Sequence, residues 1–535
     1  MRKLYLQAEN IVVSFGEQKV LDFDRFTVYQ GERIGLVGAN GAGKTTLLRA
    51  LSGELEPDGG TLKIMCDTHY FRQFSEGVDP YELDGKEMKT MQVQDKVWQE
   101  TVSGGEDTRI RLAWMFSSGK TLVFLDEPTA NLDRKGITLL KKKLLELDTM
   151  IIVSHDRALL NAVCTRIVEI RDGRLTSYDG NYDDYSQQKE QAVQRQWTEY
   201  ENYTSEKRRL EKVYLQKKEK AASIEKLPKG MSPREARLRN FISHHPKDAK
   251  ARRMEGSAQN VLERIEHLEV KEKPRELPKI RPDFRLTNPP ENAVVIRGED
   301  ICFSYETGRP RPVPTGFTDA SLAAGNSMMV SGTGGSLRNG NGKEIFRDAS
   351  FQIRNRSRVA IVGENGAGKT TLLNLIRQEY TPDSGTVYVV PKASIGLLDQ
   401  NMASLDYEKT VLQNVMEVSV QTESIARTVL ARLLLSAGDI RKKAGVLSGG
   451  ERIKLAFARL FVGRANVLIL DEPTNYLDIP SVEALEEMFS EYEGVLIFVS
   501  HDEAFIRGCA TEILEVKDGK IINYPGTPEE YFEQQ

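Results

Sequence analysis

Short runs of Val, Ile and Leu alternate in both halves of the chain with charged segments whose apolar residues have helical spacing. The clearest runs are RIGLVG, TLVFLDE and MIIVSHD, at residues 33–38, 121–127 and 150–156. Parallel strands joined by crossover helices produce this alternation. The pattern therefore predicts an α/β fold.

The middle of the chain has a different pattern. Residues 187–222 contain no Gly or Pro and are dense in Glu, Lys, Arg and Gln, which is typical of a long exposed helix. At 1.5 Å per residue this helix would span roughly 50 Å. Farther along, apolar residues recur at alternating spacings of three and four, as on the contact side of a coiled coil: Ala251, Met254, Ala258, Val261, Ile265 and Leu268. We therefore predict an antiparallel helical hairpin linker over residues 187–286, which Pro274, Pro278 and Pro282 bring to an end.

The predicted tip of this hairpin is basic, although the whole chain has a formal net charge of -4. Residues 221–253 contain nine Lys or Arg and three Asp or Glu, and several Pro and Gly residues interrupt the helical pattern. Cationic side chains attract phosphates, and an aromatic ring can stack on an unpaired base. The segment therefore indicates an RNA contact, whose candidate residues are Lys229, Arg234, Arg237, Arg239, Phe241, His244, His245 and Lys247. A solvated linker without a partner is the simpler alternative.

The chain carries two copies of one domain. GLVGANGAGKTTLL at residues 35–48 returns as AIVGENGAGKTTLL at residues 360–373, and further motifs follow in the same order in both halves. The two motifs lie more than half the length of the chain apart, which is far too long a period for a solenoid repeat. We place the two domains at 1–186 and 287–535, on either side of the hairpin.

Composition narrows the class of protein further. A chain of 535 residues with 39% hydrophobic residues can form two or more ordinary cores. Its four cysteines stand singly, which fits a reducing compartment better than a disulfide scaffold or a zinc site. No apolar run approaches the roughly 18 residues that cross a bilayer, and the start of the chain lacks the apolar core of a signal peptide. We therefore expect a soluble, cytoplasmic protein.

Each copy contains the phosphate-binding pattern G-x-x-x-x-G-K-[ST] between an apolar strand and a helix. The glycines let backbone N–H groups turn toward phosphate oxygens, the lysine neutralises the terminal phosphates, and the hydroxyl can bind Mg²⁺. A Gly-rich turn without a ligand is the alternative for one match, but two matches in register argue against it. The residues expected to bind ATP are Gly38, Asn40, Gly41, Gly43, Lys44, Thr45 and Thr46 in the first copy, and Gly363, Asn365, Gly366, Gly368, Lys369, Thr370 and Thr371 in the second.

Adjacent carboxylates end a predicted strand in each copy, as Asp126-Glu127 and Asp471-Glu472. Side chains alternate on a strand, so the two acids should face different ways. The aspartate can then hold the Mg²⁺ while the glutamate polarises the attacking water. Such a pair is often surface charge, but here PTxxLD follows it in both copies.

Histidines and glutamines occupy matching positions around these motifs. His155 and His501 follow the glutamates of their copies at distances that agree within one residue, and we assign them to the γ-phosphate in preference to a purely structural role. Gln73 and Gln400 follow the P-loop lysines at similar distances, where an amide could contact Mg²⁺ and the attacking water. The candidate metal ligands are therefore Thr45, Gln73, Asp126, Thr370, Gln400 and Asp471.

Each copy resembles the ATP-binding cassette (ABC) ATPases. The resemblance rests on the order of its motifs, which are the P-loop, the glutamine, SGGE, LDEPT, NLD or YLD, and SHD. In that family two cassettes pair head to tail, and each ATP lies between the P-loop of one and the SGG signature of the other. The resemblance implies a monomer whose own cassettes pair, an ATPase with ATP and Mg²⁺ as cofactors. It implies that Ser448, Gly449 and Gly450 complete the first site, that Ser103, Gly104 and Gly105 complete the second, and that Phe15 and Tyr305 stack on adenine.

The two copies differ in two places. The aromatic residue stands much farther upstream of the P-loop in the second copy than in the first, because the second contains an insertion at 306–342 that we interpret as an exposed loop or a poorly ordered segment. The stretch between the glutamine and the signature is shorter in the first copy, at 74–102, than in the second, at 401–447. The first copy should therefore have a shortened helical subdomain.

Two cassettes in one chain, joined by a long charged linker, resemble the ABC-F family over the whole length of the sequence. The resemblance implies that the partner is the 70S ribosome. The ATP-bound form would enter the tRNA exit site, and the linker would reach rRNA of the large subunit and P-site tRNA near the peptidyl-transferase centre. The shortened first cassette is similar to the antibiotic-resistance branch, which dislodges pleuromutilins, lincosamides and streptogramin A.

Three alternatives remain beside this interpretation. A housekeeping ABC-F translation factor would share the same chemistry. An ATPase subunit of an ABC transporter would need a helical groove for its separate membrane subunit, and the shortened subdomain and the hairpin argue against that role. A DNA-repair clamp would have far longer coiled coils and no tandem cassettes.

Overall fold

The computed structural model describes residues 2–16, 18–72, 78–99, 102–225, 234, 246–273, 282–305, 328–332, 343–398, 404–475 and 477–534. The chain divides into two units, one formed by Met1–Tyr185 with Leu277–Gln535 and the other by Ser186–Glu276. Both copies of the repeat therefore belong to the first unit, and the segment between them forms the second.

The first copy contains two sheets. A three-stranded antiparallel sheet has the order β2-β1-β4, with β1 at Leu4–Phe15, β2 at Gln18–Tyr29 and β4 at Gly59–Ile64. A six-stranded sheet has the order β5-β6-β7-β3-β8-β9 and is parallel except for its last strand. Its strands are β3 Arg33–Gly38, β5 Thr68–Phe71, β6 Leu122–Asp126, β7 Thr149–Val153, β8 Arg166–Arg171 and β9 Arg174–Asp179. Every residue of β6 and β7 is buried, as expected of parallel strands covered on both faces.

The second copy repeats this arrangement. Its six-stranded sheet has the order β15-β16-β17-β13-β18-β19, again parallel except for the last strand. The strands are β13 Arg358–Val362, β15 Ile395–Leu397, β16 Val467–Asp471, β17 Val495–Val499, β18 Glu512–Lys517 and β19 Lys520–Tyr524. The antiparallel sheet has the order β11-β14-β10-β12, with β10 at Val294–Tyr305, β11 at Met328–Gly332, β12 at Lys343–Arg354 and β14 at Ser384–Val389. The predicted α/β fold is therefore confirmed in both copies.

The insertion in the second copy differs from the loop that we expected. Residues Met328–Gly332 form β11, which pairs antiparallel with β14 at the edge of the sheet. Backbone hydrogen bonds to the exposed edge of β14 account for this strand, and the loop-forming residues around it hid the signal. Residues 306–327 and 333–342 lie outside the described part of the chain.

Helices connect the strands of both parallel sheets. In the first copy they are α1 Lys44–Leu51, α2 Gly85–Thr90, α3 Gly104–Ser117, α4 Arg134–Glu146 and α5 Arg157–Val163. In the second they are α10 Lys369–Ile376, α11 Val411–Val418, α12 Glu423–Arg432, α13 Gly449–Val462, α14 Ile479–Ser490, α15 Glu503–Cys509 and α16 Pro528–Glu533. Short 3-10 helices lie at Pro80–Glu82, Phe284–Thr287, Asp439–Arg441 and Ala444–Val446. Ahead of its signature helix the first copy has the short helix α2, where the second has α11 and α12.

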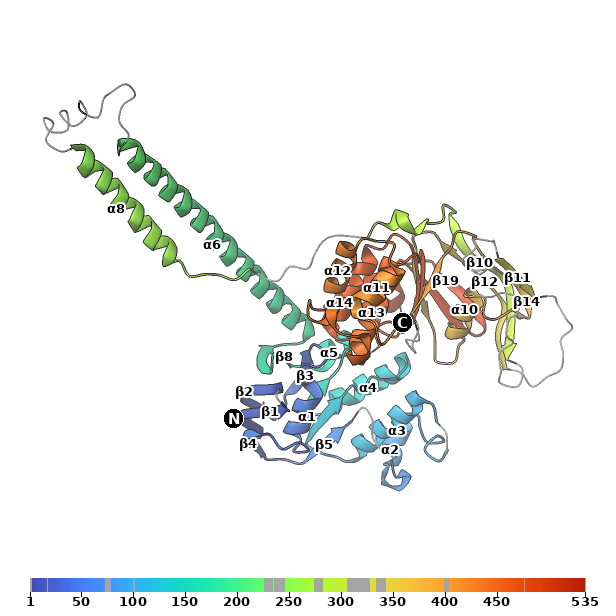
Figure 1. The fold of residues 1–535 in the computed structure, drawn as a ribbon. Coiled ribbons are helices and arrows are strands. Elements are labelled where there is room, and N and C mark those ends of the chain that lie inside the picture. The colour runs from blue at the N-terminus through green and yellow to red at the C-terminus, as the bar shows by residue number, and fades with distance from the viewer. Residues whose placement is uncertain are drawn as a thin grey trace. The chain divides into compact units, whose positions relative to one another are not determined.

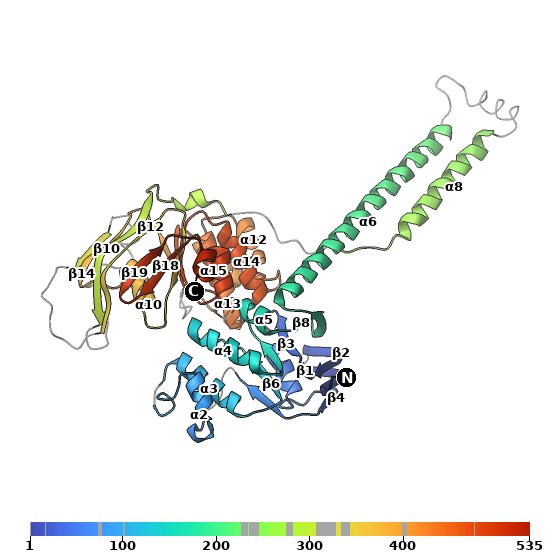
Figure 2. The ribbon, with the colours of Figure 1, turned by 180° about the vertical axis from the view of Figure 1, so that it is seen from behind.

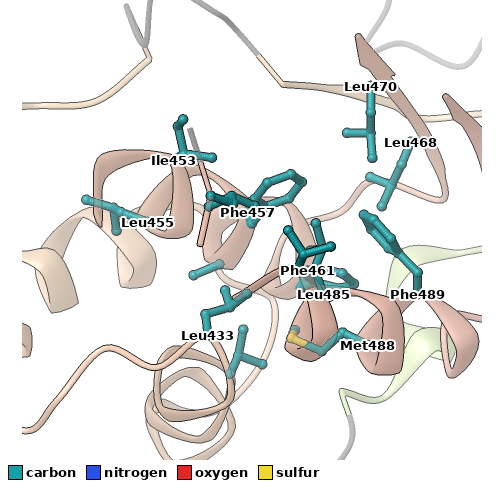
Figure 3. Close-up of a cluster of buried hydrophobic side chains, with 14 of the residues drawn as sticks. Leu433, Ile453, Leu455, Phe457, Phe461, Leu468, Leu470, Leu485, Met488 and Phe489 are labelled. Carbon is teal, nitrogen blue, oxygen red and sulfur yellow. The ribbon is translucent and has the colours of Figure 1, made fainter. Parts of the chain in front are cut away.

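A hydrophobic cluster positions the signature helix of the second copy. In both ribbon views α11–α14 lie on one side of this copy and β10, β12 and β14 on the other (Figure 1, Figure 2). Figure 3 shows side chains of α13 meeting those of α14 and of β16, among them Phe457, Phe461, Leu485, Phe489 and Leu468, all of them buried. Burying a side chain of this size stabilises the fold by about 1.5–3 kcal/mol. The start of α13 is thereby fixed relative to the strand that ends in the acidic pair.

The second unit is built from two antiparallel helices. Helix α6 runs over Tyr182–Glu225 and α8 over Pro246–Glu266, and both ribbon views show them side by side (Figure 1, Figure 2). Lys217 Nζ donates to Ser257 Oγ at 2.6 Å, and Lys271, just after α8, lies 3.6 Å from Glu199. Residues later in one helix therefore meet residues earlier in the other. Leu210 of α6 and Ala258 and Val261 of α8 are buried. The long helical linker that the sequence predicts is present.

Candidate functional site

The two phosphate-binding loops have the same backbone shape. In each copy the loop connects a central parallel strand, β3 or β13, to the first turn of a helix, α1 or α10. The N-cap glycines of these helices, Gly43 and Gly368, have φ angles of 100° and 112°. A Cβ on Gly368 would lie 2.5 Å from Cγ2 of Ile345. Only glycine fits this left-handed turn. The turn directs the backbone N–H groups at the start of the helix toward the centre of the loop, where a phosphate can bind.

The P-loop lysines fold back over their own loops. Lys44 Nζ donates to the carbonyl oxygens of Gly38 and Ala39 at 2.8 and 3.2 Å. Lys369 makes the same two bonds in its own loop, at 2.9 and 3.1 Å. Burial lowers the pKa of both ammonium groups. Burying a charge is costly unless it is paired, so an anion bound at the centre of the loop would stabilise each buried ammonium group.

In each site the hydroxyl of the P-loop threonine lies beside the aspartate that ends the neighbouring strand. Thr45 Oγ1 donates to Asp126 Oδ2 at 2.8 Å, and Thr370 Oγ1 donates to Asp471 Oδ2 at 3.3 Å. Burial raises the pKa of both aspartates, and a bound cation would favour their charged forms. Hydroxyl and carboxylate oxygens are the ligands that Mg²⁺ prefers, and the residues present therefore fit this ion.

The glutamates that follow have an unusual backbone. Glu127 and Glu472 have φ angles of 48° and 49°, in the left-handed region that non-glycine residues rarely adopt. Each strand ends at the preceding aspartate, so the left-handed turn, and not the strand alternation that we invoked, makes the two acids of each pair diverge. The backbone N–H of Glu127 donates to Val153 and that of Glu472 to Val499, which holds the turn in place. Burial raises the pKa of both glutamates to about 8.

A histidine lies beside each glutamate. His155 Nε2 is 3.2 Å from Glu127 Oε1, and His501 Nε2 is 3.5 Å from Glu472 Oε1. Burial lowers the pKa of His155 to about 3 and that of His501 to about 4, so both rings are neutral near pH 7. Among the described side chains, His155 Nδ1 is a buried polar atom without a hydrogen-bond partner. Such an atom fits a site that receives a polar ligand or a water.

Both signatures form the same N-terminal cap. Ser103 caps α3 and Ser448 caps α13, each in a capping box with the glutamate three residues later. The serine hydroxyls donate to Glu106 and Glu451 at 2.9 and 2.8 Å. Each signature therefore presents a small, exposed helix N-terminus, which carries partial positive charge. The hydrogen bonds of these serines are made within their own cassettes.

The aspartate of YLD contacts the opposite cassette in a way that we did not predict. Asp478 Oδ2 accepts a hydrogen bond of 2.6 Å from the backbone N–H of Asn40, in the P-loop of the other copy. On the second site Lys135, two residues beyond Asp133, lies 2.6 Å from Glu364 in the opposite P-loop. Both aspartates follow their glutamates at the same spacing, so the repeat was a signal that sequence reasoning could have used.

The structure also shows how the two aromatic candidates differ. Phe15 is 53% exposed at the end of β1, so its ring is available for stacking. Tyr305 instead packs edge-on against Phe303, and its hydroxyl lies 2.8 Å from Thr371 Oγ1. The hydroxyl of Thr371, a candidate for ATP binding, is therefore engaged inside the protein.

Several candidates lie outside the described residues. They are Gln73 and Gln400 at the two ATP sites and Lys229, Arg237, Arg239, Phe241, His244 and His245 at the linker tip. Arg234 is described and is exposed, and Lys247 lies in the first turn of α8. Within the described residues, none of the helices is long and apolar enough to span a membrane.

The raised pKa of the glutamates predicts a pH dependence of stability. From pH 6.5 to 8, Glu127 and Glu472 bind more protons in the folded state than in the unfolded state, whose pKa is near 4.5. The unfolded state then binds fewer protons, so the free energy of unfolding should fall as the pH rises, by at most about 1.4 kcal/mol per pH unit for each site. The measurement is urea unfolding of the nucleotide-free protein at pH 6.5 and 8.

The matched variant is Glu127→Gln with Glu472→Gln, which removes both carboxyl groups and keeps their size. Its unfolding free energy should change less between the two pH values than that of the wild type. The lowered pKa of the histidines changes stability in the opposite direction as the pH falls toward 6.5, but both proteins keep these histidines, so the comparison between them isolates the glutamates. An unchanged pH slope in the variant would contradict the assignment.

Comparisons with known proteins agree with this geometry. A family profile described as "ABC transporter" matches residues 21–79 and 346–475. The chain is 30% identical to the ABC transporter F family member 2 of Arabidopsis thaliana, over 99% of this chain and 79% of that protein. It is 33% identical to the erythromycin resistance ATP-binding protein MsrA of Staphylococcus epidermidis, over 91% of this chain and 92% of that protein. It is also 30% identical to the ribosome protection protein VmlR of Bacillus subtilis (strain 168), over 96% of this chain and 86% of that protein.

Proposed function

Because the chain belongs to the ABC-F family of tandem ATP-binding cassette ATPases, which hydrolyse ATP with Mg²⁺, we propose that it binds the 70S ribosome and protects the peptidyl-transferase centre from antibiotics. The antibiotics are those of the pleuromutilin, lincosamide and streptogramin A classes. The observation that carries the proposal is similarity along nearly the whole chain to one relative named for erythromycin resistance and one named for ribosome protection. The protein then acts in the cytoplasm, where it meets the ribosome.

A housekeeping translation factor of the same family is the second candidate. The plant family member matches this chain with 30% identity, the same value as the ribosome protection protein. Both candidates share the ATP sites and the ribosomal partner, so they differ only in whether the bound protein displaces a drug.

At each ATP site we assign one role to each side chain. Lys44 holds the terminal phosphates, Thr45 and Asp126 hold the metal ion, and the helix end at the P-loop binds phosphate oxygens through its N–H groups. When bound there, the ion would neutralise charge on the terminal phosphates. Glu127 accepts the proton of the attacking water, and neutral His155 contacts the γ-phosphate. The second site uses the corresponding residues Lys369, Thr370, Asp471, Glu472 and His501.

Closure of the cassettes couples this chemistry to the partner. The signature helices α13 and α3 present their N-termini to the γ-phosphates of the first and second sites, a contact that exists only with ATP bound. The ATP-bound form fits the tRNA exit site of the ribosome, and hydrolysis removes the γ-phosphates and releases it. The cassettes of one chain pair with each other, so the working form is a monomer.

The linker tip carries the contact with the ribosome. Arg234, Arg237 and Arg239 neutralise rRNA phosphates, and the neighbouring aromatic and histidine side chains stack on exposed bases. With about six phosphate contacts, log affinity for ribosomes falls against log salt concentration with a slope of roughly -4 to -5.

The test of this function reverses the charge of the tip. Arg234→Glu, Arg237→Glu and Arg239→Glu together should reduce the steepness of this salt dependence by about two units and abolish drug tolerance, because three phosphate contacts are lost. The measurements are ribosome co-sedimentation at several salt concentrations and growth of a susceptible bacterium on a drug panel, with and without the gene.

A matched variant reverses the charge of three exposed lysines of the first cassette, Lys120, Lys141 and Lys142. It should keep both ribosome binding and drug tolerance. Full drug tolerance in the tip variant would refute the role of the tip. Ribosome binding without drug tolerance in the wild type would favour the housekeeping candidate.

A further inference from the structure

The two ATP sites differ at the residue that faces the metal-side carboxylate. Tyr70 is the third residue of β5, and its hydroxyl donates to Asp126 Oδ2 at 3.3 Å. Thr45 donates to the same oxygen at 2.8 Å, so two hydroxyl groups hold one carboxylate oxygen of the first site.

Strand register identifies the corresponding residue of the second site. Tyr70 pairs with Phe124, two residues before Asp126. Leu397 pairs with Ile469, which is likewise two residues before Asp471. A leucine side chain has no polar atom, so at this position of the strand only the first site has a hydroxyl.

The two aspartates also differ in burial and in the length of their hydrogen bonds. Asp126 is only 5% exposed, whereas Asp471 is partly exposed. The hydrogen bond from the P-loop threonine is 2.8 Å at the first site and 3.3 Å at the second. The carboxylate that receives the tyrosine hydroxyl is therefore the more buried of the two and the closer to its threonine.

The ring of Tyr70 is held in place by its neighbours. It packs against the hydrophobic core of the first copy, and the Arg72 guanidinium lies 5.9 Å from its centre. Arg111 of α3 donates to the carbonyl of Arg72 at 3.1 Å and lies over the ring of Phe71. The corresponding position of α13 is occupied by Ala456, which cannot make these two contacts.

We propose that Tyr70 is a positioning residue of the first site, which fixes the Asp126 carboxylate beside Thr45 so that this site holds its metal-bound nucleotide more tightly than the second. A carboxylate that is already oriented loses less freedom when it receives an ion, and partners of this kind typically change metal affinity by about tenfold or more. The inference rests on the proposed role of Asp126 at the metal ion but is independent of the ribosome.

The experiment measures metal and nucleotide binding separately. The proteins that report on the first site carry Lys369→Ala, so that nucleotide binds mainly at that site. Mn²⁺ replaces Mg²⁺ as the probe, and its binding in the presence of a non-hydrolysable ATP analogue is followed by loss of the free-ion electron paramagnetic resonance signal. Binding of a fluorescent form of the analogue without divalent ion is measured in parallel.

Tyr70→Phe keeps the ring and removes only the hydroxyl. We expect its Mn²⁺ dissociation constant to rise about tenfold, while its affinity for the metal-free analogue stays unchanged. A general disturbance of the loop would weaken both. An unchanged Mn²⁺ affinity, or an equal loss in both measurements, would overturn the proposal.

Two controls separate the possible failures. The first is Leu397→Phe in a Lys44→Ala background, which places a phenyl ring at the second site. It should leave the Mn²⁺ affinity of that site unchanged. A tenfold loss would show that packing of the ring, and not the hydroxyl, sets the affinity, and would overturn the proposal.

The second control is Asp126→Asn, which should weaken Mn²⁺ binding at the first site. If it does not, the assigned role of Asp126 fails along with the inference, whereas a loss in Asp126→Asn without one in Tyr70→Phe refutes the inference alone.

Discussion

Replacing both glutamates, Glu127→Gln with Glu472→Gln, should lower ATP turnover by about 10²- to 10⁴-fold, the usual contribution of a general base. Glutamine has nearly the same shape but cannot accept the proton of the attacking water. ATP binding should persist, because the P-loop lysines and threonines are unchanged. In the presence of ATP the variant should therefore stay on 70S ribosomes, which phosphate release and sucrose-gradient sedimentation would measure.

The comparison variant is Lys44→Ala with Lys369→Ala, which removes the cations that hold the terminal phosphates. It should neither bind ATP tightly nor remain on ribosomes. Turnover near the wild-type rate in the glutamine variant would refute the role of the glutamates. Loss of turnover without ATP-dependent co-migration would instead count against the ribosomal function.

The pKa of the glutamates bears on their role as bases. Burial raises the pKa of Glu127 to about 8, whereas the charge of Lys44 lowers it. A cation held at Asp126 would lower this pKa further and favour the charged form that accepts a proton.

The second large effect is expected at the ion pair between the cassettes. Arg157, the first residue of α5, binds both carboxylate oxygens of Glu486 on α14, and the side chains are only 15% and 18% exposed. Arg157→Ala would leave a carboxylate buried without its cation. We expect the free energy of unfolding to fall by about 3 kcal/mol, as for other buried pairs that lose one partner. Urea unfolding at pH 7.5 would measure the loss.

The matched control is an ion pair of the same chemistry on the surface. Arg427 lies 2.8 Å from Glu423 within α12, with side chains 48% and 56% exposed. Arg427→Ala should cost less than about 1 kcal/mol. The double variant Arg157→Ala with Glu486→Gln should recover part of the loss, because no buried charge remains. Equal effects of Arg157→Ala and Arg427→Ala would contradict the structural assignment.

Helix α14 makes a further contact beside this ion pair. Tyr182, in the first turn of α6, is buried in the core of the first copy, and its hydroxyl donates to Glu483 of α14 at 3.1 Å. Helix α14 begins beside Asp478, the residue that binds the opposite P-loop. One helix therefore contacts an ATP site at its start and, one to two turns later, the first residues of α5 and α6.

The sequence by itself determined the parts of this protein that depend on short-range chemistry. The P-loop residues around Lys44, the acidic pair at Glu127 and the long helix before the tip could each be predicted from neighbouring residue types, because glycine conformations, strand ends and helix formation are set within a few residues. The duplication strengthened each prediction, since the second copy repeated the same spacing.

Only the tertiary structure decided which of these parts meet. The bond from Asn40 to Asp478 joins residues 438 apart, and no periodicity or local motif encodes such a pairing. Tyr70 escaped prediction for a similar reason, because a tyrosine in a short apolar strand is normally interpreted as a packing residue until the fold brings Asp126 to its hydroxyl. The left-handed turn at Glu127 is likewise imposed by hydrogen bonding to the neighbouring strand β7. Contacts of this kind depend on the path of the whole chain, which local propensities do not specify.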